Sequence, residues 1–222
     1  MKSLLTGLLI ISSLQIANAA STATISAVRE KVVELRITRP EVLRALDTKK
    51  NKKIRIENLP NQSLCSGAVI TGRGDILTAR HCVEGSSQID VTFADGREYR
   101  AVVLAVSGRH DLALIHVDRF NTPFFNIAAG IAQGQQIYVM GNPVGVIGSL
   151  SSGIVAKRNG DIDFIDVTVL PGNSGGPAFN EKGELVGITT AGIIVLYGFS
   201  HLNIMQSIDA ILGFGLEIQG VR

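Results

Sequence analysis

The segment 171–177, Pro-Gly-Asn-Ser-Gly-Gly-Pro, places Ser174 in a glycine-lined turn between two apolar runs, 164–170 and 185–190. Both runs are short and rich in β-branched residues, which is typical of strands. Glycine adopts backbone angles that a Cβ forbids, and it leaves room for another group to approach main-chain N–H groups. The segment therefore predicts a β protein that presents a serine hydroxyl beside backbone amides, as a nucleophile with an oxyanion hole requires.

Short apolar runs separated by turns continue through the chain from residue 64 onward, in two groups joined by a connector at 118–134. The first group of predicted strands covers 65–70, 76–79, 89–93, 98–106 and 112–117. The second group covers 136–140, 149–155, 164–170, 178–179, 185–190 and 193–200. Apolar residues have helical spacing at 203–212. The pattern predicts an all-β fold of two six-stranded antiparallel β-barrels with a short C-terminal helix.

The composition narrows the class of protein and its partners. The chain has 222 residues, of which 45% are hydrophobic and 18% are charged, as in globular proteins. A formal net charge of +2 is too small to indicate a nucleic-acid partner or a membrane surface. We expect no cofactor, and the oligomeric state stays open.

Residues 1–19 have the pattern of a secretory signal peptide. Lys2 supplies the positive end, 4–11 is the apolar core, and Ala17-Asn18-Ala19 is an A-x-A cleavage site. A membrane anchor is the alternative, but the apolar run is shorter than the ~20 residues that span a bilayer. We therefore expect an exported protein, periplasmic or secreted, without stable membrane insertion after removal of the signal.

The leader that follows, residues 20–60, is harder to assign. Its part at 21–46 is compatible with a helix that Pro40 interrupts, and 47–53 is a basic run best read as a solvated loop. The leader could be a propeptide, a linker or an embracing arm. The main domain is expected over 61–222, with one barrel at about 61–120 and the other at about 130–215.

The chain contains two cysteines, Cys65 and Cys82. In an oxidising compartment they could form a disulfide, which would brace the segment that carries His81. Two free buried thiols are the alternative. A metal site is not expected, because two thiols without clustered histidines provide too few ligands.

Two residues upstream of the serine could activate it. His81 follows one apolar run and Asp111 precedes another. A serine hydroxyl is a weak nucleophile until a base removes its proton, and imidazole titrates close to neutral pH. Asp111 could orient the ring and stabilise the imidazolium, while the N–H groups of Gly172 and Ser174 could form the oxyanion hole. Each residue alone is weak evidence, but their joint occurrence predicts a catalytic triad of His81, Asp111 and Ser174.

Several segments together resemble the trypsin-fold serine proteases, and most closely the bacterial HtrA (Deg) type. These segments are 75–83, 95–99, 111–115, 141–143, 152–155, 171–177 and 183–188. The resemblance covers about residues 64–212. It implies a double β-barrel with the active site in the cleft between the barrels, and hydrolysis of peptide bonds in polypeptide substrates through an acyl-enzyme.

The chain also departs from that pattern. HtrA-like proteins usually carry a C-terminal PDZ domain, and the sequence ends at Arg222, so no PDZ-dependent allostery is expected. The cysteine pair instead resembles the bridge near the histidine of animal-type trypsins. Those relatives have an aspartate before the nucleophile that pairs with a newly cut N-terminus. Asn173 occupies this position and has no charge, so we expect no such zymogen switch.

The resemblance also implies substrate-binding positions. Thr168 is expected at the base of the primary pocket, with Thr189, Thr190 and Ala191 along its wall and the edge that binds the substrate main chain. No carboxylate is expected there, which favours a small or medium apolar side chain before the scissile bond. The remaining histidines, at 110, 116 and 201, are interpreted as structural or surface residues.

Two other functions compete with a protease. Residues 172–176 also match the G-x-S-x-G nucleophile elbow of α/β-hydrolases. That motif needs a following helix and a triad in the order serine, acid, histidine, whereas Pro177 and an apolar run follow Ser174. A trypsin fold that has lost catalysis and acts as a binding module is the other alternative.

Overall fold

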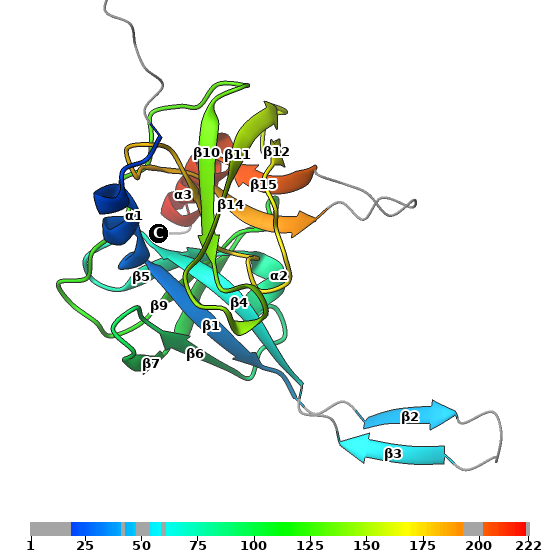
Figure 1. The fold of residues 1–222 in the computed structure, drawn as a ribbon. Helices are drawn as coiled ribbons and strands as arrows, with labels where there is room; N and C mark the ends of the chain where they lie inside the picture. Colours follow the sequence, from blue (N-terminus) through cyan, green and yellow to red (C-terminus); the bar gives the residue numbers. More distant parts are fainter. Residues whose placement is uncertain (1–18, 41–42, 48–53, 59–60, 193–201, 221–222) are drawn as a thin grey trace, which may run out of the picture.

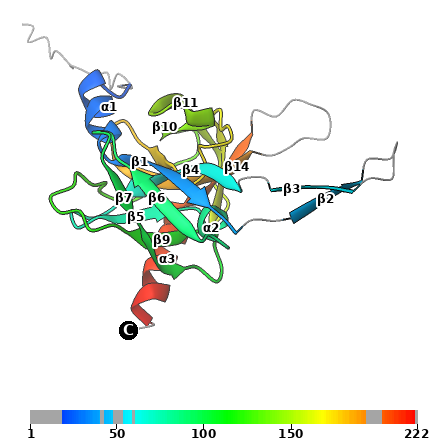
Figure 2. The same ribbon diagram turned by 90° about the horizontal axis from the view of Figure 1, so that it is seen from below.

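A computed structural model describes residues 19–40, 43–47, 54–58, 61–192 and 202–220. Its strands form a seven-stranded sheet from the first half of the chain and a closed six-stranded barrel from the second half (Figure 1). A two-stranded unit, β2 (Leu43–Asp47) with β3 (Ile54–Asn58), projects away from both (Figures 1 and 2). Among the helices of these described ranges, none combines the length and hydropathy needed to cross a membrane.

The seven-stranded sheet has the order β7-β6-β1-β4-β5-β9-β8, and all neighbouring strands are antiparallel. Its strands are β1 (Val32–Thr38), β4 (Gln62–Val69), β5 (Asp75–Thr78), β6 (Gln88–Thr92), β7 (Glu98–Arg100), β8 (Val102–Val106) and β9 (Ala113–His116). Apart from β1, each corresponds to a predicted strand, with ends shifted by a few residues.

The predicted strand at 98–106 is divided by Ala101 into β7 and β8, which form the two edges of the sheet. β7 pairs with β6 and β8 pairs with β9, while the N–H of Ala101 donates to the carbonyl of Ile89 at 3.0 Å. The two edges are therefore joined by the chain and not by a hydrogen-bonded ladder. The expectation of a closed six-stranded barrel is wrong for this half of the protein.

The expectation of a closed six-stranded barrel is confirmed for the second half. The strand order around the barrel is β10-β11-β12-β15-β14-β13. The strands are β10 (Gln136–Gly141), β11 (Ser149–Lys157), β12 (Ile162–Asp166), β13 (Pro177–Phe179), β14 (Leu185–Gly192) and β15 (Asn203–Ser207), with a short 3-10 turn η1 (Pro143–Gly145) after β10.

The helix expected within 21–46 is confirmed only for its first part. Helix α1 (Thr22–Arg29) begins after Ser21, whose hydroxyl accepts a hydrogen bond from the N–H of Thr24 at 3.0 Å. The next apolar residues form β1, which pairs with β4 on one side and β6 on the other. Because β1 is central to the sheet, the expected domain start at residue 61 is too late. Val33, Leu35 and Ile37 alternate with polar residues along β1, which is strand spacing that the helical interpretation of 21–46 did not take into account.

The helical expectation for 203–212 is also half wrong. Residues Asn203–Ser207 form β15, paired with β12 and β14, and helix α3 (Ile208–Gly220) begins only afterwards. The hydroxyl of Ser207 accepts a hydrogen bond from the N–H of Ala210 at 3.3 Å, which starts the helix. The predicted signal peptide up to residue 18, the predicted strand at 193–200 and the histidine at 201 lie outside the described residues.

Three apolar clusters hold the described part of the chain together. One lies within the sheet and another within the barrel. The third joins the two β structures to helices α1 and α3, and its members include Val28, Val32, Leu77, Tyr138, Phe179 and Phe214. The sheet and the barrel therefore share a buried interface, which fixes residues of one half against residues of the other.

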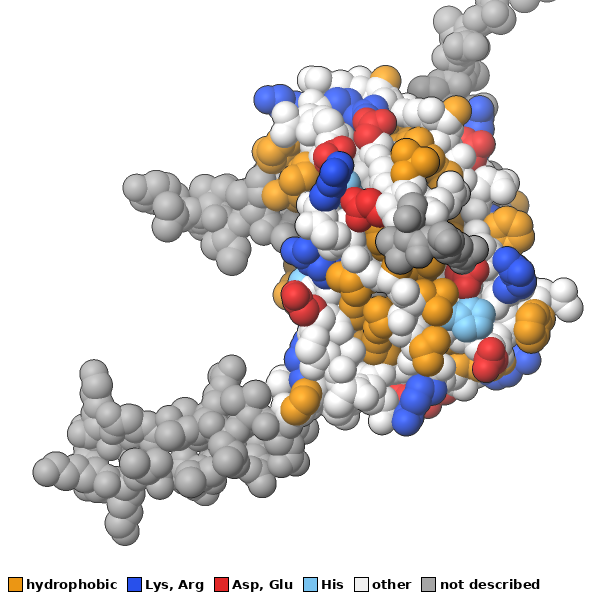
Figure 3. All heavy atoms as spheres, turned by 180° about the vertical axis from the view of Figure 1, so that it is seen from behind, with side chains coloured by type: hydrophobic (Ala, Val, Ile, Leu, Met, Phe, Trp, Pro, Cys, Tyr) orange, Lys and Arg blue, Asp and Glu red, His pale blue; other side chains and the backbone are white. Residues whose placement is uncertain are grey.

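The face opposite to that of Figure 1 carries mixed side chains (Figure 3). Hydrophobic groups gather near its middle, and acidic and basic groups alternate around them. This face accordingly has no extended field of one sign, in keeping with the net charge of +2.

Replacing Ile37 should show that β1 belongs to the folded core. Its side chain is fully buried in β1, so Ile37→Ala should lower the free energy of unfolding by ~2–5 kcal/mol, measured by urea denaturation. Leu104→Ala is a suitable control, because Leu104 is 54% exposed in β8, and this change should cost less than ~0.5 kcal/mol. Equal small losses for both variants would contradict a core position of β1.

Candidate active site

His81 lies in a one-turn helix, α2 (Arg80–Val83), immediately after strand β5. Residues 76–79 before it are buried, so the entry to α2 is fixed by the core of the sheet. The His81 side chain itself remains 47% exposed. The buried segment before α2 fixes the backbone of His81, so the half-exposed imidazole lies at the surface in a defined position.

Asp111 contacts His81 twice. One carboxylate oxygen, Oδ2, lies 2.7 Å from Nδ1 of the ring, and the other, Oδ1, accepts a hydrogen bond from the backbone N–H of His81 at 2.9 Å. The carboxylate therefore fixes both the direction of the ring and the backbone from which it extends. The structure thus brings two of the three predicted catalytic residues into direct contact.

The ionisation of Asp111 determines the tautomer of His81. Burial alone would raise the pKa of Asp111, but the hydrogen bonds from the His81 ring and backbone outweigh it, and the pKa lies below its ordinary value. An ionised carboxylate only accepts hydrogen bonds, so the ring nitrogen that faces it, Nδ1, carries the proton. Neutral His81 then has its lone pair on Nε2, where a base needs it.

A compact turn between β8 and β9 holds Asp111. The N–H of Ser107 donates to the carbonyl of Leu112 at 3.0 Å, and the Ser107 hydroxyl accepts from the N–H groups of Arg109 and His110 at 3.1 and 3.0 Å. His110 is buried, with Nδ1 3.9 Å from a carboxylate oxygen of Asp161. The turn is therefore anchored on both sides of the aspartate.

Arg39 binds the backbone of the helix that carries His81. It was not identified from the sequence, because it lies within the leader. Its guanidinium donates to the carbonyls of His81 and Cys82 at 3.0 Å each, and to the Ser63 hydroxyl at 2.8 Å. A one-turn helix leaves its last carbonyls without intrahelical donors, and Arg39 supplies them. Arg39 follows a segment in which apolar and charged residues alternate, and nothing in that pattern marks it as a donor to the helix of His81.

Ser174 lies in the loop between β12 and β13, in the barrel half. Asn173 N–H donates to the carbonyl of Leu170 at 2.9 Å, closing a turn in which Gly172 has φ +103°. A Cβ on Gly175 would come within 2.1 Å of Oγ1 of Thr78, so only glycine fits there. Strand β13 follows the loop, and this excludes the nucleophile elbow, which requires a helix.

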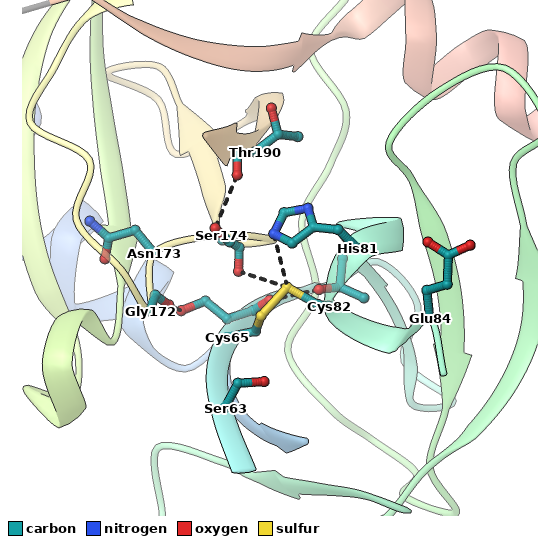
Figure 4. The surroundings of a disulfide bond; sticks show 12 residues. Ser63, Cys65, His81, Cys82, Glu84, Gly172, Asn173, Ser174 and Thr190 are labelled. Atoms are coloured by element: carbon teal, nitrogen blue, oxygen red, sulfur yellow. Dashed lines mark hydrogen bonds between the residues drawn. A yellow bond between two sulfur atoms is a disulfide. The ribbon is translucent and has the colours of Figure 1, made fainter. Parts of the chain in front are cut away.

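Ser174 and His81 meet across the junction of the sheet and the barrel (Figure 4). Sγ of Cys82 lies 3.7 Å from both Nε2 of His81 and the carbonyl oxygen of Ser174. The Ser174 hydroxyl donates to the carbonyl of Thr190 at 3.0 Å. The His81 ring and the Ser174 hydroxyl thus lie on the same side of the disulfide, but in this structure the hydroxyl proton is directed to a backbone oxygen.

The predicted disulfide between Cys65 and Cys82 is confirmed. It joins β4 to α2 directly beside His81, as Figure 4 shows. In the described part of the chain, these two cysteines and His81 are the only group with metal-ligand spacing. Because the sulfur atoms are bonded to each other, they offer no thiolate to a metal ion.

The predicted substrate-binding residues occupy different environments. Thr168 is exposed in the segment after β12. Thr189 is fully buried, and its hydroxyl donates to the carbonyls of Asn173 and Gly176 at 2.6 and 3.1 Å, so it braces the serine loop instead of lining an accessible wall. Thr190 and Ala191 lie in β14 beyond its ladder with β13, which ends at Ile188.

Removing the disulfide should destabilise the protein and loosen the His81 segment. The bridge spans 17 residues, for which loop closure in the unfolded chain corresponds to about 3 kcal/mol. The double variant Cys65→Ala/Cys82→Ala should therefore lose roughly 2–4 kcal/mol of unfolding free energy in urea. Wild-type protein with reductant provides the matched comparison, and unchanged stability in both would contradict a structural role of the bridge.

The depressed pKa of Asp111 predicts acid sensitivity. Its stabilising contribution is present above the ordinary value of 3.8 and is lost as the pH falls toward the lower pKa of the folded state. Urea unfolding of Asp111→Asn should therefore show a shallower loss of stability than wild type when the pH decreases below about 4. Asp166→Asn, at an exposed site, should keep the wild-type slope. Identical slopes for all three proteins would argue against the stabilising contact.

The model of the trypsin-like peptidase domain matches residues 65–188 of this chain. These residues include His81, Asp111 and Ser174. The match covers more than half of the chain.

Relatives with curated names are similar over the same region. A probable periplasmic serine endoprotease DegP-like from Halomonas elongata is 35% identical over 158 residues, covering 67% of this chain and 33% of the relative. A protein of the same description from Brucella suis is 38% identical over 138 residues, covering 57% of this chain and 27% of the relative. The chain thus spans about a third of the length of the curated relatives it matches.

Solved structures agree with the fold. The HtrA-type protease AlgW with a decapeptide has a TM-score of 0.72 at 27% identity, over 89% of this chain and 66% of that one. A serine endoprotease from Yersinia pestis, at 24% identity, has a TM-score of 0.71 over 90% of this chain and 67% of that one. From the family match and these similarities, we conclude that the chain belongs to the trypsin-like peptidase domain family.

Proposed function

We propose that this chain is an exported serine endopeptidase that hydrolyses peptide bonds through an acyl-enzyme. The observation that carries the proposal is the double contact of Asp111 with the ring and backbone of His81, beside the loop of Ser174. An ion pair that only stabilised the fold would not need a ring that is 47% exposed. In this role Ser174 is the nucleophile, His81 the general base and Asp111 the orienting acid.

In each of the two stages of the reaction, His81 first accepts a proton and then donates it. Oγ of Ser174 attacks the substrate carbonyl carbon while its proton passes to Nε2 of His81, and Asp111 stabilises the imidazolium without taking the proton. His81 then gives that proton to the leaving amine as the carbon–nitrogen bond breaks. A water molecule, deprotonated by His81, attacks the acyl-enzyme, and the carboxylic product leaves as Ser174 regains its proton.

The negative oxygen of the tetrahedral intermediate needs hydrogen-bond donors. The N–H groups of Gly172 and Ser174 donate to no acceptor among the described residues. Their neighbours along the loop, the N–H groups of Asn173 and Gly175, are already bound to the carbonyls of Leu170 and Thr189. The two unused amides suit an oxyanion hole, in which losing one donor typically costs about 10²–10³ in rate.

The position of the Ser174 hydroxyl corresponds to a resting state in this proposal. Its bond to Thr190 is 3.0 Å long, and the proposed reaction requires Oγ to turn from that carbonyl toward Nε2 of His81. Catalytic hydrogen bonds of free enzymes are often formed only when substrate is bound. Substrate main chain that pairs with β14 competes for the same Thr190 carbonyl and releases the hydroxyl.

The substrate is a polypeptide in this proposal. Beyond Ile188, the edge of β14 at Thr190 and Ala191 extends past its ladder with β13, and it suits the addition of a substrate strand. A small or medium apolar side chain before the scissile bond would then lie near Thr168. Solved relatives of the HtrA type carry a decapeptide or a tripeptide, which supports a peptide ligand.

Export follows from the signal-like sequence at residues 1–19 and from the disulfide. The curated relatives are described as periplasmic, which supports a periplasmic or secreted location for this chain.

Labelling with a fluorophosphonate probe tests the proposed nucleophile. Wild-type protein should be labelled at Ser174 and should cleave casein, whereas Ser174→Ala should lose both properties and keep its melting temperature. Asp111→Asn should lower kcat by roughly 10⁴, the loss known for this substitution in other triads. Ser152→Ala, in β11 away from the loop, should keep wild-type labelling and cleavage.

A binding module with an inactive trypsin fold gives the opposite result. Folded wild-type protein would then show neither labelling nor cleavage, and it would still bind peptides along β14. The bond between the Ser174 hydroxyl and Thr190, which holds the proton away from His81, is the observation that favours this second function.

A further inference from the structure

A buried polar network lies directly behind the loop that carries Ser174. Its centre is Ser66 of β4, which is fully buried. The Ser66 hydroxyl donates to the carbonyl of Gly172 at 2.8 Å, and the Ser66 N–H donates to the carbonyl of Ser174 at 2.8 Å. One residue of the sheet thus holds the carbonyls of Gly172 and Ser174, the residues on either side of Asn173.

The direction of the Ser66 hydroxyl is fixed by its own partners. A hydroxyl has one proton and two lone pairs. Asn142 occupies both lone pairs, donating from its backbone N–H at 3.0 Å and from Nδ2 at 3.1 Å. The proton therefore remains for the carbonyl of Gly172, and the group has no alternative arrangement without a lost hydrogen bond. Asn142 is buried and is held in turn by the carbonyl of Val33 at 3.1 Å.

The peptide groups of the loop can be followed one by one. The peptide between Asn173 and Ser174 is held at its carbonyl by Thr189 and by the N–H of Gly176 at 2.9 Å, which directs the Ser174 N–H the opposite way. The peptide between Gly172 and Asn173 is held at its carbonyl by the Ser66 hydroxyl and at its N–H by the carbonyl of Leu170 at 2.9 Å, and Ser66 is the contact that comes from the sheet. This peptide is joined through the Cα of Gly172 to the N–H of Gly172. Gly172 has φ +103° and no Cβ to restrict its backbone rotation.

We propose that Ser66, oriented by Asn142, is a positioning residue that keeps the Gly172 amide directed at the reacting carbonyl. This inference rests on the proposed peptidase function. Ser66 does not touch the substrate. It binds the carbonyl of Gly172 and thereby restricts the backbone of Gly172, whose N–H is the proposed donor. Pre-oriented donors lower the barrier because they need no reorganisation as charge develops, and a small misplacement can cost about 10²-fold in rate.

The experiment compares Ser66→Ala with a buried serine that makes the same kind of bond elsewhere. Ser207 is also fully buried, and its hydroxyl donates to the carbonyl of Gly160 at 2.7 Å in the barrel, away from the serine loop. Both substitutions remove one buried hydroxyl from a carbonyl, so the losses of melting temperature should be similar. The probes are a fluorogenic peptide with valine before the scissile bond and the peptide boronic acid of the same sequence, whose tetrahedral adduct occupies the oxyanion hole.

Ser66→Ala should lower kcat by about 10–100-fold with KM within about twofold of wild type. The inhibition constant of the boronic acid should rise by the same factor as kcat/KM falls, because adduct and transition state use the same amide. Ser207→Ala should leave kcat and the inhibition constant within about twofold. A role in stability alone predicts equal behaviour of the two variants, and that result would overturn the inference.

Asn142→Ala provides a second route to the answer should Ser66→Ala fold poorly. It leaves the Ser66 hydroxyl in place and removes one of its two donors, the Nδ2 of Asn142, while the backbone N–H remains, so kcat and boronic acid affinity should fall together, by less than for Ser66→Ala. The double variant should be no worse than Ser66→Ala, since both act through one bond. Wild-type protein that resists fluorophosphonate would refute the proposed function itself, whereas active wild type with unaffected Ser66→Ala and Asn142→Ala refutes only the positioning role.

Discussion

The hydrogen bonds of Ser66 to the loop of the barrel are the interaction on which the site depends. His81 and Asp111 belong to the sheet, while Ser174 belongs to the barrel, so the three side chains meet only if the two halves keep one relative position. The apolar cluster between the halves supplies most of the attraction, but apolar contacts are not directional. Hydrogen bonds that cross the same junction add the direction that a catalytic arrangement requires.

Much of this arrangement could be predicted from the sequence. His81, Asp111 and Ser174 could be proposed as a triad because each stands beside a short apolar strand, and strands of this kind are recognised by their β-branched composition. The disulfide could be anticipated because an exported chain with two cysteines has one possible pairing. Five of the six strands of the closed barrel, all but β15, could be predicted from apolar runs separated by turn signals.

Other features depended on contacts that no local pattern encodes. Val33, Leu35 and Ile37 alternate with polar residues along β1 as in a strand, although the longer segment 21–46 was also compatible with a helix, and the pairing with β4 and β6 decides between the two. The division of the strand at Ala101 depends on a bend between two edges of one sheet. Arg39 was missed and Thr189 was expected at the pocket wall, because their roles lie in hydrogen bonds to distant backbone carbonyls, which no local sequence pattern marks. Long-range bonding of this kind must be seen in three dimensions.

Arg39 also has a consequence for how this fold can vary. Its N–H donates to the carbonyl of Asn61 at 3.0 Å, and the ladder of β1 with β4 begins next to this bond, at the pair of Thr38 and Gln62. The chain therefore leaves the sheet at Arg39 and returns to it at Asn61, beside the point of departure. Lengthening a loop with pinned ends costs little entropy, so this excursion can be exchanged between homologues, or grafted, while the neighbouring strands stay in register.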